Sequence, residues 1–173
     1  VQPADDAPSD ASGRMLLGEL EKAAARGVRV RLLLDDNGTS GLDRELAALD
    51  RRPNIEVRLF NPFTVRRPKL IGYAMDPLRL NRRMHNKSIT ADNQATIVGG
   101  RNVGDAYFGA SRESLFADLD VLAVGAVVPE VSADFDRYWD SESAYPAATI
   151  LPDSGAARRP PLPANAARLA RAY

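Results

Sequence analysis

The spacing of apolar residues predicts alternating helices and strands in the first sixty positions. A helical stripe runs through residues 14–26 and ends at Gly27, a residue that commonly follows the last turn of a helix. Apolar runs at 28–34 and 55–60 predict two buried strands, and a helix with Ser40 as its N-cap is predicted between them. This alternation predicts an α/β fold with a mixed, largely parallel sheet flanked by helices.

The middle of the chain predicts a hairpin and a helix. Residues 84–90 and 94–98 read as two strands, and the connection at 91–93 is short enough for a hairpin turn. Asn102 is placed to cap a helix that ends at Gly109. The site residues discussed below therefore lie on or beside a hairpin.

Two further elements and one loop complete the predicted domain. A strand is predicted at 119–125 and a helix at 129–139, with Pro129 in its first position. Three prolines interrupt residues 61–83, which we expect to form a long loop with helical pieces.

Composition allows one domain with a real core, because 173 residues with 45% hydrophobic side chains are too few for a second full domain. Five prolines fall between Pro146 and Pro163, in a stretch rich in alanine. We therefore assign residues 1–145 to the domain. Residues 146–173 are predicted to be a Pro/Ala-rich linker and the start of a further helix.

The net charge and the length of the apolar runs indicate which kinds of partner to expect. The 23 basic and 23 acidic residues cancel, so nucleic acid is not an expected partner. No apolar run approaches the roughly 18 residues that a membrane span requires, so this chain is expected to be soluble. The absence of cysteine leaves the compartment open.

His85 and Lys87 are the strongest candidates for chemistry. His85 is the only histidine and Lys87 is one of three lysines. Residues two apart in a strand point to the same face, so we expect the two side chains to project together. A neutral imidazole can attack phosphorus, and an ammonium can neutralise phosphoryl oxygens. The alternative is a histidine satisfied by local hydrogen bonds beside a solvated lysine.

Several neighbouring residues have both a functional and a structural interpretation. Asp92 is either a turn former or a site residue. Gly100, with Gly99, permits close approach of the backbone to a ligand, and Asn102 could bind phosphate or simply cap a helix. Asp118 could accept a hydrogen bond from His85 and fix which ring nitrogen attacks, or be an ordinary surface acid.

Arg82 and Arg83 form a basic lip next to His85, suited to a phosphate group or to solvent. A metal centre is not predicted, because one histidine and no cysteine leave only carboxylates as ligands. No cofactor is predicted either.

The spacing of these residues resembles a known motif. His85-x-Lys87, then Asp92 after four residues, then Gly99-Gly100-x-Asn102, resembles the HKD motif of the phospholipase D superfamily. The segments 81–87, 98–108 and 116–121 are similar to bacterial cardiolipin synthases. The resemblance covers about residues 12–146 and implies a phospholipase D-like domain.

The resemblance implies a role for each matching residue. His85 would attack phosphorus, Lys87 and Asn102 would hold the phosphoryl oxygens beside Gly100, Asp118 would orient His85, and Asp92 would support the site structurally. Members of the superfamily form a phosphohistidine without metal and pass the phosphatidyl group to water or to an alcohol. In the synthases the acceptor is the glycerol head of another phospholipid.

The chain departs from the family in having one motif and no second histidine, whereas two motifs normally share one active site. We expect either the N-terminal half of a two-motif enzyme, favoured by the abrupt start and the linker-like tail, or two copies that meet about a two-fold axis. The expected partners are a phospholipid, a bacterial membrane surface and a second HKD half. The alternatives are a homodimeric endonuclease and an inactive lipid- or phosphate-binding module.

Overall fold

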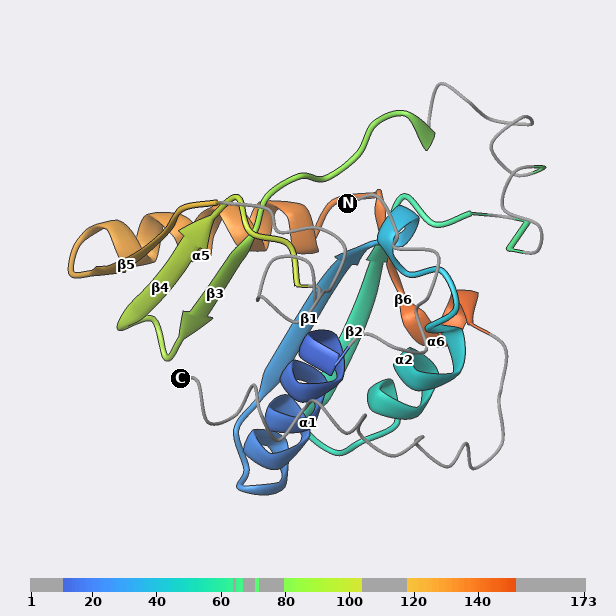
Figure 1. Ribbon diagram of the computed structural model, residues 1–173, viewed down its shortest axis with the longest axis horizontal. Coiled ribbons are helices and arrows are strands. Elements are labelled where there is room, and N and C mark those ends of the chain that lie inside the picture. The colour runs from blue at the N-terminus through green and yellow to red at the C-terminus, as the bar shows by residue number, and fades with distance from the viewer. Residues whose placement is uncertain (1–10, 64, 67–70, 72–79, 104–117, 152–173) are drawn as a thin grey trace.

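The computed structural model of the protein describes residues 11–63, 65–66, 71, 80–103 and 118–151. In these residues the strands form two three-stranded sheets, with helices against both (Figure 1). The predicted mixed α/β class is therefore confirmed. Among the described helices, none combines the length and the apolar character that a membrane crossing requires.

The first sheet has the strand order β1-β2-β6. Strand β1 (Val30–Asp35) is parallel to β2 (Ile55–Phe60), and β6 (Ala144–Pro146) is antiparallel to β2. The parallel register pairs Asp35 with Phe60, so the carboxyl ends of β1 and β2 lie at the same edge.

The second sheet has the order β3-β4-β5 and is antiparallel. It consists of β3 (Ser88–Ala91), β4 (Ala95–Gly99) and β5 (Asp120–Val124). Parallel pairing is thus confined to β1 and β2 among the described strands. The predicted hairpin at 84–98 is present, but its first strand begins at Ser88, four residues later than the sequence indicates.

Three helices pack against one face of the first sheet. Helix α1 (Ala11–Ala25) lies in front of β1 and β2 in Figure 1, with α2 (Asp43–Asp50) and α6 (Ala147–Ile150) beside it. The core between them is aliphatic, because alternate positions of each strand point to this face. Its buried members are Ala24, Val30, Leu46, Ala47, Leu49, Ile55, Val57, Leu59, Ala147 and Leu151.

Helix α5 (Val127–Trp139) contacts both sheets. It packs against β3, β4 and β5, and its last turn reaches the opposite face of the first sheet. There the guanidinium carbon of Arg58 lies 4.4 Å from the ring centre of Trp139, and that of Arg31 lies 5.4 Å from the same ring. Cation–π contacts of this kind attach α5 to the first sheet.

Two predicted helix starts are wrong. Helix α2 begins at Asp43 with Leu42 in the N-cap position, so Ser40 does not cap it. A short 3-10 helix at Asp36–Gly38 occupies the preceding turn. Helix α5 begins at Val127, so Pro129 is its third residue; proline is tolerated there because the first-turn N–H groups have no intrahelical acceptor.

The fold continues past residue 145. Strand β6 ends at Pro146, α6 follows, and Leu151 is only 6% exposed within the core. The boundary predicted after residue 145 falls inside β6, and a linker further on stays a prediction. The helix predicted from Asn102 to Gly109 falls largely outside the described residues.

Candidate active site

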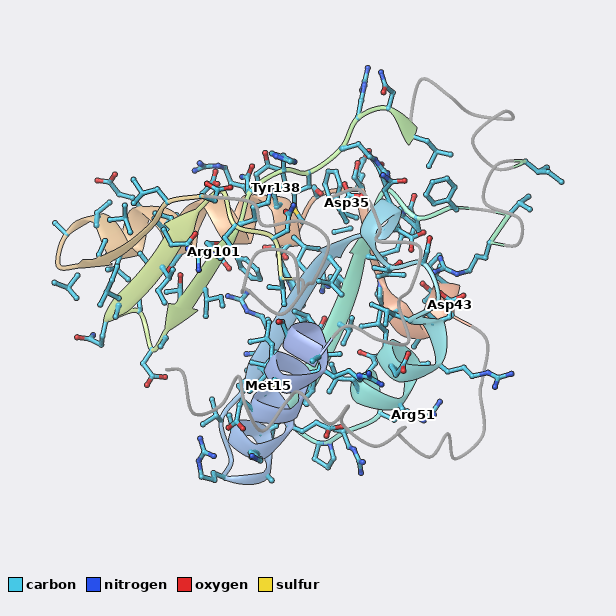
Figure 2. The ribbon with its side chains drawn as sticks, viewed as in Figure 1. Met15, Asp35, Asp43, Arg51, Arg101 and Tyr138 are labelled. Carbon is cyan, nitrogen blue, oxygen red and sulfur yellow. The ribbon has the colours of Figure 1, made fainter. Side chains whose placement is uncertain are left out.

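The chain segment before His85 is fastened to the carboxyl end of β1. Asp35 is the last residue of β1. One of its carboxylate oxygens, Oδ2, accepts a hydrogen bond from the Met84 N–H at 2.8 Å. The other, Oδ1, lies 2.9 Å from Nη1 of Arg83. Figure 2 shows Asp35 at this edge of the first sheet.

The residue after β2 holds the same segment. Asn61 follows β2 directly, and its carbonyl oxygen accepts a hydrogen bond from Nη2 of Arg83 at 3.0 Å. Its side-chain amide donates to the Arg82 carbonyl. The ends of two parallel strands therefore fix residues 82–84, at the edge of an α/β sheet where ligands commonly bind.

His85 and Lys87 come together just before β3. Nζ of Lys87 donates a hydrogen bond to the His85 carbonyl oxygen at 3.1 Å. The Lys87 carbonyl accepts from the Gly99 N–H at 3.2 Å, which begins the pairing with β4. Both residues precede β3, so the ammonium reaches His85 by folding back along the chain rather than by strand alternation. His85 is exposed and Lys87 is half-buried.

Asn86, the residue between His85 and Lys87, is hydrogen-bonded to α5. Nδ2 of Asn86 donates to Oδ2 of Asp134 at 3.3 Å. His85 thus stands exposed on a backbone that is held on both sides, by the first sheet before it and by α5 and β4 after it. This arrangement leaves the imidazole accessible while its chain position is fixed.

Gly100 lies against the carboxylate of Asp118. A Cβ atom built on Gly100 would lie 2.5 Å from Oδ2 and 2.7 Å from Cγ of Asp118, closer than real Cβ atoms approach other groups. On Gly99 it would lie 2.7 Å from the Leu119 carbonyl oxygen and 2.8 Å from Cα of Asp120. The two glycines therefore permit the close approach of β4 and the residues around the start of β5.

Asp118 acts electrostatically on Lys87. Partial burial lowers the pKa of Lys87, and the negative charge of Asp118 opposes that shift. In the described part of the chain, Oδ1 of Asp118 accepts a hydrogen bond from the Leu119 N–H at 2.8 Å rather than from His85. The structure thus brings Asp118 to Lys87 and Gly100, and shows no Asp118–His85 hydrogen bond among those residues.

Asn102 and its neighbour Arg101 lie next to this group. Asn102 is half-buried at the end of the Gly-Gly segment. Nε of Arg101 is 3.0 Å from Oδ2 of Asp120, and its Nη2 donates to the Asp118 carbonyl at 3.3 Å. Figure 2 labels Arg101 beside the second sheet.

Asp92 is not brought to His85. It lies in the turn after β3, with a φ of 49° followed by a φ of 55° at Asn93. The Gln94 N–H donates to the Ala91 carbonyl at 2.9 Å, which closes the turn. Because a strand rises about 3.3 Å per residue, the ends of β3 are roughly 10 Å apart. These contacts are those of a turn-forming residue.

The two arginines of the predicted basic lip differ in how far their side chains are exposed to solvent. Arg82 is exposed, whereas Arg83 is half-buried and paired with Asp35. Only Arg82 therefore presents its guanidinium to solvent beside His85. Among the described residues, no group of three or more His, Cys, Asp or Glu side chains is arranged to hold a metal ion.

Sequence reasoning missed three residues of this region, namely Asp35, Asn61 and Arg101. Arg101 stands inside the Gly-Gly-x-Asn segment, so the signal was available. Asp35 and Asn61 directly follow the two strands predicted at 28–34 and 55–60, and site residues gather at such strand ends in α/β folds. Their partners, however, lie 49 and about 21 positions away and could not be named from spacing.

The group can supply a nucleophile and a cation to one phosphate-sized ligand. The imidazole is exposed, the Lys87 ammonium lies against the same stretch of backbone, and Arg82 adds an exposed cation nearby. An exposed imidazole, with an ammonium bound to the carbonyl of the same residue, suits attack on phosphorus with stabilisation of the developing negative charge.

Comparison with known proteins identifies the family of the chain. The family model described as "Cardiolipin synthase, PLD-like domain" matches residues 10–139. The chain is 58% identical over 158 residues to cardiolipin synthase C of Escherichia coli K12, covering 90% of this chain and 33% of that protein. It is 35% identical over 136 residues to a cardiolipin synthase of Staphylococcus aureus Mu50, covering 78% and 26%.

An uncharacterized protein of Helicobacter pylori 26695 is 41% identical over 144 residues, which are 82% of this chain and 29% of that protein. The chain thus spans between a quarter and a third of the length of these relatives. The family model covers well over half of the chain. The chain therefore belongs to the family of phospholipase D-like domains found in cardiolipin synthases.

Proposed function

We propose that this chain carries one half of a phosphatidyltransferase site of the cardiolipin synthase type, with His85 as the nucleophile. The observation that carries the proposal is the exposed imidazole on a backbone held from both sides, with the Lys87 ammonium bound to the same residue. The similarity to cardiolipin synthases supports a phospholipid as the substrate, presented at a membrane surface.

In the first step a nitrogen of His85 attacks the phosphorus of a phospholipid phosphodiester. An N–P bond forms, the P–O bond to the leaving alcohol breaks, and the alcohol oxygen takes up a proton. The Lys87 ammonium and the amide of Asn102 interact with the phosphoryl oxygens as negative charge builds on them. Because Gly100 has no side chain, the Asp118 carboxylate can lie against its backbone, on the side where it acts on Lys87.

In the second step the hydroxyl of an acceptor attacks the phosphohistidine. The new P–O bond forms as the N–P bond breaks, the acceptor loses its proton, and His85 returns to its starting state. A glycerol head group as acceptor gives phosphatidyl transfer, and water gives hydrolysis. Asp118 supports this chemistry through its charge next to Lys87, and Asp92 through the turn that closes the hairpin.

The acid that protonates the leaving alcohol comes from a second HKD half. This chain has a single histidine, so a second imidazole belongs either to another part of the same protein or to a second copy. The two cases differ in their response to dilution. If a second copy supplies the acid, specific activity falls as protein concentration is lowered below the dissociation constant of the dimer. If the same polypeptide supplies it, specific activity stays constant.

Replacement of His85 tests the nucleophile. The protein in its full natural length is incubated with phospholipid labelled at phosphorus, and the acid-labile, alkali-stable adduct expected of phosphohistidine is quantified together with the transfer product. We expect His85→Asn to lose both signals while its melting temperature stays near that of the wild type, because the side chain is exposed.

Ser88→Ala is the matched control for this experiment, since it changes an exposed residue close to His85 and leaves the imidazole in place. We expect the control to keep a labelled adduct. Labelling of the His85→Asn protein at a rate close to that of the wild type would rule out His85 as the nucleophile.

A further inference from the structure

We propose that Asp35 is a positioning residue for His85, which it holds in place through Met84 and Arg83. For its kinetic consequence the inference rests on the proposed function. Asp35 belongs to β1, 50 positions before His85, and lies outside the HKD motif.

The carboxylate of Asp35 accepts two backbone hydrogen bonds and forms one ion pair. Its side chain is only 8% exposed. Oδ1 accepts from the Asn37 N–H at 2.9 Å and lies 2.9 Å from Nη1 of Arg83, while Oδ2 accepts from the Met84 N–H at 2.8 Å. A buried carboxylate with this set of donors is a strong and directional anchor.

Arg83 extends the anchor to the end of β2. Its Nη2 donates to the Asn61 carbonyl at 3.0 Å, and its guanidinium carbon lies 5.7 Å from the centre of the Phe63 ring. The guanidinium is therefore held from three directions. Its ion pair with Asp35 links the ends of both parallel strands to the residue two positions before His85.

The position of the imidazole is restricted because the backbone on both sides of His85 is held. Fixing the Met84 N–H leaves few backbone torsions between the anchor and Cα of His85. On the other side, Asn86 is held by Asp134 and Lys87 by Gly99. Asp35 thus supplies the anchor on one side of the nucleophile. A displacement of about 1 Å at a reacting group can cost about 100-fold in rate.

The kinetic test compares Asp35→Ala with Asp50→Ala in the protein at its full natural length. Asp50 is the matched control, because its carboxylate also accepts a backbone hydrogen bond, from the Val57 N–H at 2.7 Å, but has no link to residues 82–87. We expect Asp35→Ala to lower kcat about 100-fold more than Asp50→Ala, with little change in KM.

Two further variants separate positioning from general damage to the fold. Asp35→Asn keeps an oxygen for the Met84 N–H and is expected to recover part of the lost kcat. In the double variant Asp35→Ala/Arg83→Ala we expect a loss smaller than the product of the two single losses, because the two residues share one ion pair. Equal kcat values for Asp35→Ala and Asp50→Ala would overturn the proposal.

A second measurement does not depend on activity. The ring Hε1 NMR signal of His85 is identified as the one that disappears in the His85→Asn variant. We expect Asp35→Ala to shift and broaden that signal and Asp50→Ala to leave it unchanged. An unchanged signal in both variants would refute positioning. If His85→Asn keeps wild-type turnover while Asp35→Ala still moves the signal, the proposed function fails and the positioning contact stands.

Discussion

Lys87 and Asp118 are two oppositely charged residues of the candidate site that interact electrostatically. Burial disfavours the charged form of Lys87 and lowers its pKa, and the carboxylate of Asp118 partly compensates. The folded-state pKa lies below the reference value of 10.5, so the unfolded state binds the proton more tightly. The contribution of this group to stability therefore improves as the pH rises from below the folded-state pKa to above 10.5.

Replacing Asp118 should change the titration of Lys87. We expect Asp118→Asn to lower the pKa of Lys87 further, because it removes the negative charge that opposes the desolvation effect. Nζ-detected NMR on a chain with three lysines can follow this shift directly. Lys22, which pairs with Glu19 at 2.7 Å on α1, is the internal control. An unchanged Lys87 titration in the variant would contradict the pairing.

The candidate residues could be named from the sequence, but their contacts could not. The sequence predicts that the His85 and Lys87 side chains project together from a strand, whereas both residues precede β3 and the Lys87 ammonium binds the His85 carbonyl. It did not reveal that Asp118 would approach Lys87, or that Asp35 would hold Met84. These contacts join residues 31 and 49 positions apart, and such distances are set by the tertiary fold rather than by local spacing.

At the scale of the elements, Gly99 and Gly100 permit the close approach of β4 to residues 118–120 in different ways. A side chain on Gly99 would meet backbone atoms of Leu119 and Asp120. A side chain on Gly100 would first meet the carboxylate of Asp118, which is exposed and can rotate away. The first contact can be relieved only by moving a strand, the second by moving one side chain.

Gly99→Ala should therefore mainly lower stability, and Gly100→Ala should mainly lower activity. We expect Gly99→Ala to lower the free energy of unfolding by about 1–3 kcal/mol, since the backbone of β5 must shift. Gly100→Ala should cost less than that in stability but should lower turnover, because it pushes the Asp118 carboxylate from its place near Lys87. Denaturant unfolding and the phosphatidyl transfer assay measure the two effects. The reverse order of stabilities would contradict the geometry.

Sequence patterns locate the elements better than their ends. The strand predicted at 28–34 is present as β1 at Val30–Asp35, and the strand at 55–60 is present as β2. Strand β6 was not predicted, since three residues with two prolines nearby carry no periodic signal and pair only because β2 offers an edge. The predicted start of β3 is too early because the Met84 N–H bonds to Asp35 rather than to a neighbouring strand.

At the scale of the whole molecule, the C-terminal part of the described chain belongs to the core. Ala147 is completely buried and Leu151 is nearly so, and both contact the aliphatic cluster between the first sheet and its helices. The alternation of helices and strands was sufficient to predict the α/β class. It could not show that the strands divide into two sheets, because pairing between distant strands leaves no local signature.

A substitution at Leu151 tests whether this part stabilises the fold. We expect Leu151→Ala to lower the free energy of unfolding by about 3 kcal/mol, as is typical for a leucine removed from a packed core. Ala148→Ser, on the exposed side of α6, should change it by less than about 0.5 kcal/mol. Thermal or urea unfolding of the two variants provides the comparison. Equal stability of both would place the end of the domain before α6.

Trp139 lies where α5 meets the first sheet, and it is the only tryptophan in the chain. The chain consequently has a single indole emitter, only 3% exposed, stacked on Phe135 with ring centres 5.5 Å apart. A red shift of its emission would therefore mark the moment when water enters that one junction. Followed alongside circular dichroism during denaturation, the fluorescence would tell whether the two sheets separate before their strands are lost.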